Sequence, residues 1–415
     1  MTAEIIVANK SGLAIAADSA VTVEQFHNGG MKQKVYNGAN KLFMLSKYKP
    51  VGIMLYNTTT VGGVPWETII KSVRQDISDK DFSKLDEYIE YFFRKTDSEA
   101  YLFPEDGVRQ IVWVNAYKIL NSIVESSSDK SDFSKRLDAR IVELEKLDLV
   151  SGWTLSFGDE VIKVYKSEIN VAINISVSPK GYLHGNRAKI LRLLKLNFVK
   201  KARLSGYSGI VICGFGKEEM FPRVVEHYCD IVLCGKIRRW ELGREAVNVS
   251  SPSLVMPFAD TAVIRTIMEG VNPNYQSSMT RKLAEVLLAI PKELFAPITQ
   301  LTDVEKDGYA QAAMGAMVSS LSTLLKGISS IRKEEYMEPI KRTIQVLPVS
   351  ELAVVAETMI SVSQIHKRMN PEIESVGGAI DVAVISKGDG FVWIKRKHYF
   401  DRDLNPGFIA KYLDK

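Results

Sequence analysis

The order of the short apolar segments limits most strongly what this chain can fold into. Two runs rich in Ile, Val and Ala, 3–9 and 12–17, are separated by Lys-Ser-Gly and predict a buried strand hairpin. A second pair of strands is expected at 41–45 and 51–56. The first helix follows at 65–77, where apolar residues recur three and four positions apart. Because four strands precede the first helix, a fold that alternates strands and helices is disfavoured.

Helical and strand-like sequence then alternate in large blocks. Residues 75–205 are charged and helix-periodic, with Ser- and Asp-rich breaks between the helices. Helices are expected again from 262 to 337. Between the two helical blocks, apolar runs predict strands at 209–216, 223–229 and 230–237.

The end of the chain returns to a helix followed by strands. Residues 351–369 have the apolar pattern of a well-buried helix, and 377–396 predict a hairpin that turns at Lys-Gly-Asp-Gly. Strands, helices, strands, helices and a final strand pair favour two packed sheets with helices outside them. We therefore expect the α+β class.

The composition is that of an ordinary globular chain. Of 415 residues, 46% are hydrophobic and 25% are charged. The 54 Lys and Arg exceed the 49 Asp and Glu without forming a polybasic block, so nucleic acid is not an expected partner. The residues after Met1 do not resemble a secretory signal, and no stretch approaches the roughly 18 apolar residues of a membrane span. We therefore expect a cytoplasmic protein with no membrane partner.

The three cysteines are expected to be core residues. Cys213, Cys229 and Cys234 all lie in apolar, strand-like sequence, and their odd number argues against a disulfide framework. His227 lies nearby, but the spacing does not match the paired cysteines of zinc sites. We expect neither a metal site nor a cofactor.

Three segments of the chain are similar to proteasome-type β subunits. They are TAEIIVANKSGLAIAADSAVT at the start, KLFML at 41–45, and GGAIDVAVISKGDGFV from Gly377. These subunits belong to the N-terminal nucleophile hydrolases, and the resemblance implies their four-layer αββα sandwich, with two antiparallel sheets between helical layers. The corresponding division is a core of 1–74, 207–270 and 350–415, a mostly helical insertion at 75–206, and a second helical insertion at 271–349.

The resemblance implies a catalytic set of Thr2, Asp18 and Lys41. Met1 precedes a small residue, so its removal is expected to give Thr2 a free α-amino group that serves as base for its own hydroxyl. The family carries a carboxylate sixteen residues beyond its threonine, which here is Asp18. Its lysine stands directly before an apolar strand and lowers the pKa of the hydroxyl. This pattern favours Lys41, with a seven-residue insertion, whereas a rigid count from Thr2 ends near Lys34.

Other positions depart from the family pattern. The glycine that supplies an oxyanion-binding N–H is replaced by Leu55 or Tyr56. The aspartate and serine that precede a Gly-Gly pair correspond to Glu374 and Ser375, shifted by one residue from Gly377. Leu55, Glu374, Ser375 and Gly377 are therefore expected to be supporting residues only.

The leading hypothesis is a proteasome-like threonine peptidase that cleaves amide bonds of a peptide or protein through an acyl-enzyme on Thr2. An amidase that acts on a small amide is the nearest variant. A noncatalytic scaffold of the same fold, like the α-type subunits of proteasomes, is the alternative from another class. The resemblance also implies a homo-oligomer, such as a ring, formed through the helices at 262–337 and 351–369. An ATPase partner is left open.

Overall fold

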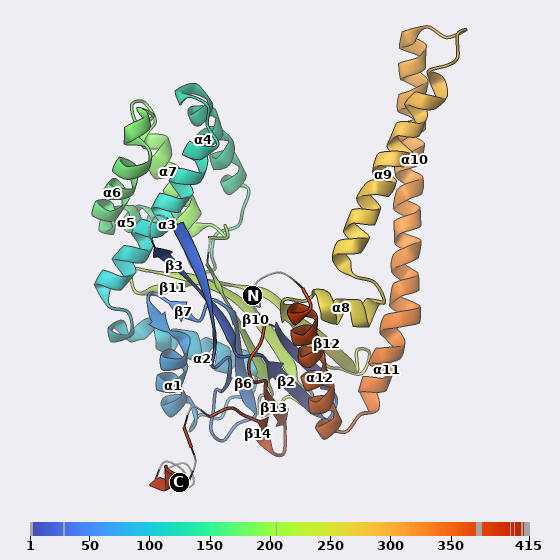
Figure 1. Ribbon diagram of the computed structural model, residues 1–415. Coiled ribbons are helices and arrows are strands. Elements are labelled where there is room, and N and C mark those ends of the chain that lie inside the picture. Colours follow the sequence, from blue (N-terminus) through green and yellow to red (C-terminus); the bar gives the residue numbers. More distant parts are fainter. Residues whose placement is uncertain are drawn as a thin grey trace.

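The computed structural model describes residues 3–27, 30–204, 206–370, 376–398, 400–401, 403–407 and 410, with the side chains of 22–33 and of position 100 left out. Two five-stranded sheets, antiparallel throughout, form its centre (Figure 1). The first has the order β12 (Ser253–Ala259), β1 (Ala3–Asn9), β2 (Gly12–Ala17), β13 (Asp381–Ser386), β14 (Gly390–Lys395). The second has the order β11 (Lys236–Ala246), β10 (Arg223–Leu233), β9 (Ser208–Gly214), β6 (Val51–Asn57), β5 (Leu42–Met44). The chain is therefore a mixed α+β protein, as expected.

The two ends of the sequence meet in the first sheet. β1 and β2 form the predicted hairpin, and β13 pairs with the other side of β2. Gly12 lies where these strands are closest: a Cβ at this position would be 2.7 Å from the carbonyl oxygen of Ile385. Only a glycine fits at this contact without moving backbone. The predicted terminal hairpin is also present, as β13 and β14.

A first group of helices lies on the second sheet and extends away from it (Figure 1). It comprises α1 (Trp66–Ile77), α2 (Leu85–Ser98), α3 (Glu105–Glu125), α4 (Lys130–Glu145), α5 (Leu155–Val164), α6 (Lys166–Ser176) and α7 (Arg187–Val199). These helices confirm the helical prediction for 75–205. Buried side chains of α3, α4 and α7 share one apolar cluster with β6, β9 and β10, so this lobe continues the core of the sheet.

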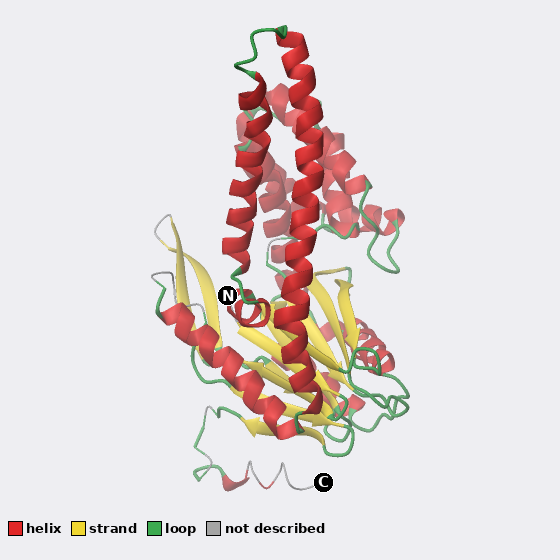
Figure 2. Cartoon of the chain, turned by 90° about the vertical axis from the view of Figure 1, so that its right-hand side faces the viewer, coloured by secondary structure: helices red, strands yellow, loops and turns green. Residues whose placement is uncertain are grey.

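A second group of helices follows β12. It comprises α8 (Ala262–Glu269), α9 (Pro273–Phe295), α10 (Asp303–Ile331), a π-helical segment (Arg332–Met337), α11 (Glu338–Val346) and α12 (Val349–Arg368). α12 packs on the first sheet, as its buried residues contact β1 and β2. α9 and α10 form a long hairpin that projects from the body of the protein (Figures 1 and 2).

Each strand of the first sheet directs alternate side chains to two different apolar clusters. Ile5 and Val7 pack with helix residues such as Leu352 of α12. Ile6 packs with residues of the second sheet, such as Met54. Both faces of β1 are thus buried, which explains why its sequence is apolar at almost every position.

The structure corrects several strand predictions. β3 (Ala20–His27) and β4 (Gly30–Asn37) form a separate hairpin in the stretch 22–40, for which no strand was predicted. Its polar residues resemble loop sequence because this hairpin joins neither five-stranded sheet. β12 was also not predicted. A further short pair, β7 (Thr60–Val61) and β8 (Val64–Pro65), precedes α1.

The two strands predicted at 223–229 and 230–237 are one strand, β10, followed by β11. The predicted boundary fell between Cys229 and Asp230, but Asp230 is buried and bonded to Arg238 in the neighbouring strand. A buried ion pair across the ladder allows an aspartate where its propensity favours a turn. The turn to β11 lies at Cys234 and Gly235, both with positive φ.

Within the described residues, no helix combines the length and hydropathy needed to cross a bilayer.

We expect His227 to make the protein less stable in acid. Burial lowers the pKa of His227, which lies against the Phe93 ring, from 6.5 to about 4. The unfolded chain therefore binds a proton below pH 6.5 that the folded chain binds only near pH 4, and stability falls across this interval by about 3 kcal/mol. Urea unfolding at pH 7 and pH 4 should show this loss in the wild type and not in His227→Leu. The exposed His184 provides the control: His184→Leu should leave the pH dependence unchanged.

Candidate active site

Asp18 follows β2 directly and accepts four hydrogen bonds at the point where β1 begins. Its Oδ1 accepts the N–H of Ala3 at 3.1 Å and the Nζ of Lys41 at 2.6 Å. Its Oδ2 accepts the N–H of Gly377 at 2.9 Å and that of Ala20 at 3.2 Å. The carboxylate is buried, so these donors compensate its charge in place of water and fix its orientation.

Lys41 immediately precedes β5, and only 1% of its surface is exposed. Besides Asp18, its Nζ lies 3.7 Å from Oε1 of Glu4. Its carbonyl oxygen accepts the N–H of Leu55 at 2.9 Å, which ties its backbone to β6. The result is a rigid, desolvated cation beside the start of β1.

Lys34 lies elsewhere. It is on β4, its side chain is exposed, and its Nζ lies 4.9 Å from the ring centre of Tyr36. Of the two lysines considered from the sequence, the structure brings Lys41 and not Lys34 to Asp18.

Thr2, Glu374 and Ser375 lie outside the described residues. Two residues close to them in sequence are described, and both contact Asp18. Ala3 and Gly377 donate their N–H groups to its two carboxylate oxygens. Positions 3 and 377, from opposite ends of the chain, thus meet at this carboxylate.

Glu4 is a second buried carboxylate near Lys41, and sequence reasoning did not identify it. It lies on the face of β1 that points toward the second sheet, with neighbours Ile6 and Ala8 in the cluster between the sheets. The available signal was a charged residue inside the otherwise apolar strand AEIIVAN. Two carboxylates thus neighbour one ammonium group at the start of β1.

Leu55 and Tyr56 occupy the end of β6, where the resemblance expects a glycine. Leu55 is buried, and its N–H is bonded to Lys41 as described above. The Tyr56 hydroxyl donates to Glu226 of β10. Burial, together with the Glu226 carboxylate, raises the pKa of Tyr56 far above its ordinary value, so the hydroxyl keeps its proton.

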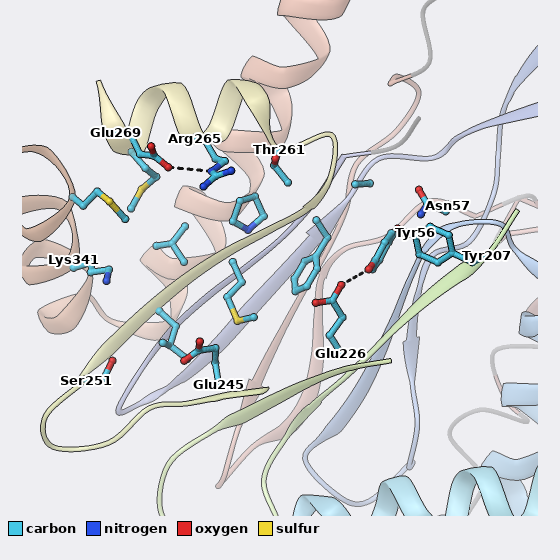
Figure 3. A pocket seen from close by; sticks show the side chains of 18 residues that line it. Tyr56, Asn57, Tyr207, Glu226, Glu245, Ser251, Thr261, Arg265, Glu269 and Lys341 are labelled. Atoms are coloured by element: carbon cyan, nitrogen blue, oxygen red, sulfur yellow. Dashed lines mark hydrogen bonds and ion pairs between the residues drawn. The ribbon is translucent and has the colours of Figure 1, made fainter. Parts of the chain in front are cut away.

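A pocket of about 590 Å³ opens beside Tyr56 (Figure 3). Tyr56, Tyr207 and Phe258 form an aromatic wall, with Tyr56 5.8 Å from Phe258 and 6.2 Å from Tyr207 between ring centres. Arg265 and Glu269 of α8 form an ion pair on the opposite side. The pocket combines an apolar wall with a few polar groups, which is typical of ligand-binding sites.

The pocket is close to the start of β1. Ala259, which lines it, is paired with Ala3 in the sheet. Two lining residues end their strands in the left-handed region: Asn57 with φ 62° and Ala259 with φ 59°. Such a conformation costs an alanine about 1–2 kcal/mol, and strain of this kind concentrates at functional sites.

The pocket also runs along the open edge of β12, because consecutive residues from Leu254 to Ala259 line it. Ala3 directs its carbonyl group to the N–H of Asp18, on the β2 side. Strand alternation then directs the backbone groups of Val255, Pro257 and Ala259 away from β1, toward the open edge. Pro257 has no N–H to donate, as is common in edge strands. An extended chain could therefore pair with Val255 and Ala259.

Two of the three cysteines are core residues as expected, whereas Cys234 lies in the turn between β10 and β11. Cys213 and Cys229 are buried, Cys234 is partly exposed, and all three are free thiols. Burial raises the pKa of Cys213 to about 12, which leaves its thiol unreactive near neutral pH. In the part of the chain that the structure describes, no cluster of three or more His, Cys, Asp or Glu has the arrangement of a metal site.

Comparisons with protein-family models, with curated proteins and with solved structures gave no significant match. A function for this chain is therefore inferred from its own residues and their geometry.

Proposed function

We propose that this protein is an amide hydrolase of the N-terminal nucleophile type, with Thr2 as nucleophile after removal of Met1. The observation that carries the proposal is the buried Asp18–Lys41 ion pair, bonded to the N–H of Ala3 at the start of β1. The apolar cluster shared by the two sheets supports the four-layer sandwich that the proposal requires. So do the helix clusters on the outer face of each sheet.

The α-amino group of Thr2 carries the proton transfers of the proposed reaction. The Thr2 Oγ attacks the carbonyl carbon of the substrate while its proton passes to the α-amino group of the same residue. That proton then goes to the departing amine, and the acyl group stays on Oγ as an ester. Water, deprotonated by the same amine, hydrolyses the ester and restores the threonine. Lys41 lowers the pKa of the hydroxyl by its charge, and Asp18 holds Lys41 in place.

Asn57 is the donor we propose for the oxyanion. The N–H of Leu55 is already bonded to Lys41, and strand alternation directs the N–H of Asn57 to the same side of β6. Asn57 ends its strand and lines the pocket, so we propose that its N–H binds the oxyanion that develops there.

We propose a peptide with a bulky apolar side chain as the substrate. The open edge of β12 offers backbone partners to an extended segment, and the aromatic wall of the pocket offers contact to its side chain. A small amide would contact the aromatic wall of the pocket but would have no backbone to pair with the open edge of β12. We therefore prefer a peptidase to an amidase.

One observation favours the noncatalytic scaffold instead. Glu4 lies beside Lys41, and a second carboxylate would reduce the effect of the lysine charge on a nearby hydroxyl.

Hydrolysis of a fluorogenic peptide library and of a panel of small amides by the purified full chain tests the proposed activity. We expect cleavage by the wild type, reduced cleavage by Thr2→Ser, and a loss of at least about a thousandfold in Thr2→Ala. Full activity in Thr2→Ala would exclude this nucleophile, and cleavage of small amides alone would favour the amidase.

A further inference from the structure

The outer side of α10 has no neighbour within the described part of this chain. α10 packs against α9 along one side, where Tyr309 lies 5.8 Å from the Phe295 ring and Ala310 is buried. Its other sides are exposed over most of the length of the hairpin (Figure 2). Contacts with α9 therefore do not account for the composition of the exposed side of α10.

That exposed helix is unusually free of charge. From Gly308 to Leu325 the sequence has no Asp, Glu, Lys, Arg or His. Charged residues make up 25% of the chain, so a stretch of this length would carry about four or five of them on average. A helix without charge on any side is typical of one buried on several sides.

Three glycines in the same helix have no close neighbour from another described part of the chain. A Cβ added at Gly308, Gly315 or Gly327 would meet no described atom within 4 Å. Each glycine nevertheless destabilises a helix interior by about 1 kcal/mol relative to alanine. Gly158 in α5 shows the opposite case, since a Cβ there would lie 2.8 Å from Lys195. The α10 glycines are explained if another helix lies against them.

Gly308 and Gly315 belong to a continuous face of small residues. This small-residue face consists of Gly308, Ala312, Gly315, Ala316, Ser319 and Thr323, all exposed. Their spacing of three and four residues places them on one side of the helix, opposite the side that contacts α9. Small side chains allow two helix axes to approach to the short end of the usual range, about 8 Å.

We propose that two copies of this chain pair through the small-residue face, with α10 antiparallel to α10 about a two-fold axis between Gly315 and Ala316. This register places Gly308 opposite Thr323 and Ala312 opposite Ser319, so small residues meet small residues throughout. It also brings Glu305 of each copy opposite Lys326 of the other.

The charges at the two ends of the face select a second copy as the partner. Glu305 and Lys326 are both exposed and flank the uncharged stretch, one at each end. An antiparallel copy of the same helix matches each of them with its opposite, and a parallel copy does not. The proposal is independent of the proposed catalytic function.

The test is the mass of the full-length protein in solution, measured by sedimentation over a range of concentrations. We expect a dimer, or a larger assembly built from dimers. Ala316→Arg should weaken the pairing about 100-fold or more, because it places a charged side chain from each copy at the two-fold axis. Ala289→Arg, an exposed alanine of α9 in the same hairpin, is the matched control and should leave the mass unchanged.

Cross-linking tests the direction of the pair. The double variant Ala312→Cys with Ser319→Cys should form a disulfide between copies on mild oxidation, because the two positions face each other in the antiparallel register. A monomeric wild type at high concentration, or an Ala316→Arg protein whose mass equals that of the wild type, would overturn the proposal. If the single variant Ala312→Cys formed a disulfide between copies, the antiparallel register would be wrong.

Discussion

Replacing Lys41 with methionine is expected to reduce amide hydrolysis by at least about a thousandfold, and to lower the free energy of unfolding by about 3–5 kcal/mol. Both effects have one cause. The Nζ of Lys41 lies 2.6 Å from Asp18 in a site closed to water. Without the ammonium group, the Asp18 carboxylate stays buried with backbone N–H donors alone, and the Thr2 hydroxyl loses the charge that lowers its pKa. Peptide cleavage and urea unfolding, measured on the same samples, give both quantities.

Two further variants separate the loss of catalysis from the loss of stability. Lys34→Met removes an exposed lysine and should change neither quantity. Lys41→Met combined with Asp18→Asn also removes the Asp18 charge and leaves Glu4 as the buried carboxylate beside position 41, so it should regain part of the stability and none of the activity. If Lys41→Met, or the more stable double variant, kept a tenth of wild-type activity, Lys41 would not have the proposed role.

Arg238→Met is expected to destabilise the fold by about 3–5 kcal/mol without a direct effect on the candidate site. Arg238 is completely buried and forms an ion pair with Asp230. Its Nη2 also donates to the carbonyl oxygens of Asn197, at 3.0 Å, and Lys200, at 2.6 Å. The side chain thus joins the end of α7 to β10 and β11. Its removal leaves buried carbonyl groups without this donor and a buried carboxylate without its partner.

The neighbouring Arg239 provides the control. It pairs with Asp97 at 2.7 Å, but about a quarter of its side chain is exposed, so Arg239→Met should cost no more than about 1 kcal/mol. Combining Arg238→Met with Asp230→Asn should regain at least part of the loss, because the buried charge is then gone. Urea unfolding at pH 7 measures all three. If Arg238→Met and Arg239→Met lowered the free energy of unfolding equally, the buried ion pair would contribute no more to stability than the partly exposed one.

The sequence predicted those parts of the fold in which local pattern and burial agree. β1, β2, β6 and α12 have apolar patterns that match their period and their buried faces. The pattern failed for the β3–β4 hairpin, whose polar residues resemble a loop. It failed again at Asp230, where a contact with Arg238 that is formed only in the folded chain keeps the strand continuous.

The candidate site was predictable to a similar extent. Asp18 and Lys41 were selected by the resemblance and by the position of a lysine directly before a strand, and the structure places them 2.6 Å apart. Glu4 was missed because its neighbour Lys41 is far along the chain. The bond between Tyr56 and Glu226 was missed for the same reason, since it joins strands of distant sequence. Contacts between remote segments leave no local pattern in one sequence.

The most direct test of the proposed nucleophile is the intact mass of the purified protein, with and without a β-lactone probe that acylates N-terminal threonine. We predict a mass that lacks Met1, one probe molecule per chain, and a fragment spectrum that places the adduct on Thr2. Thr2→Ala should take up no probe. A protein that keeps Met1 and forms no adduct would contradict the proposed mechanism, because Thr2 would then have no free amine to act as its base.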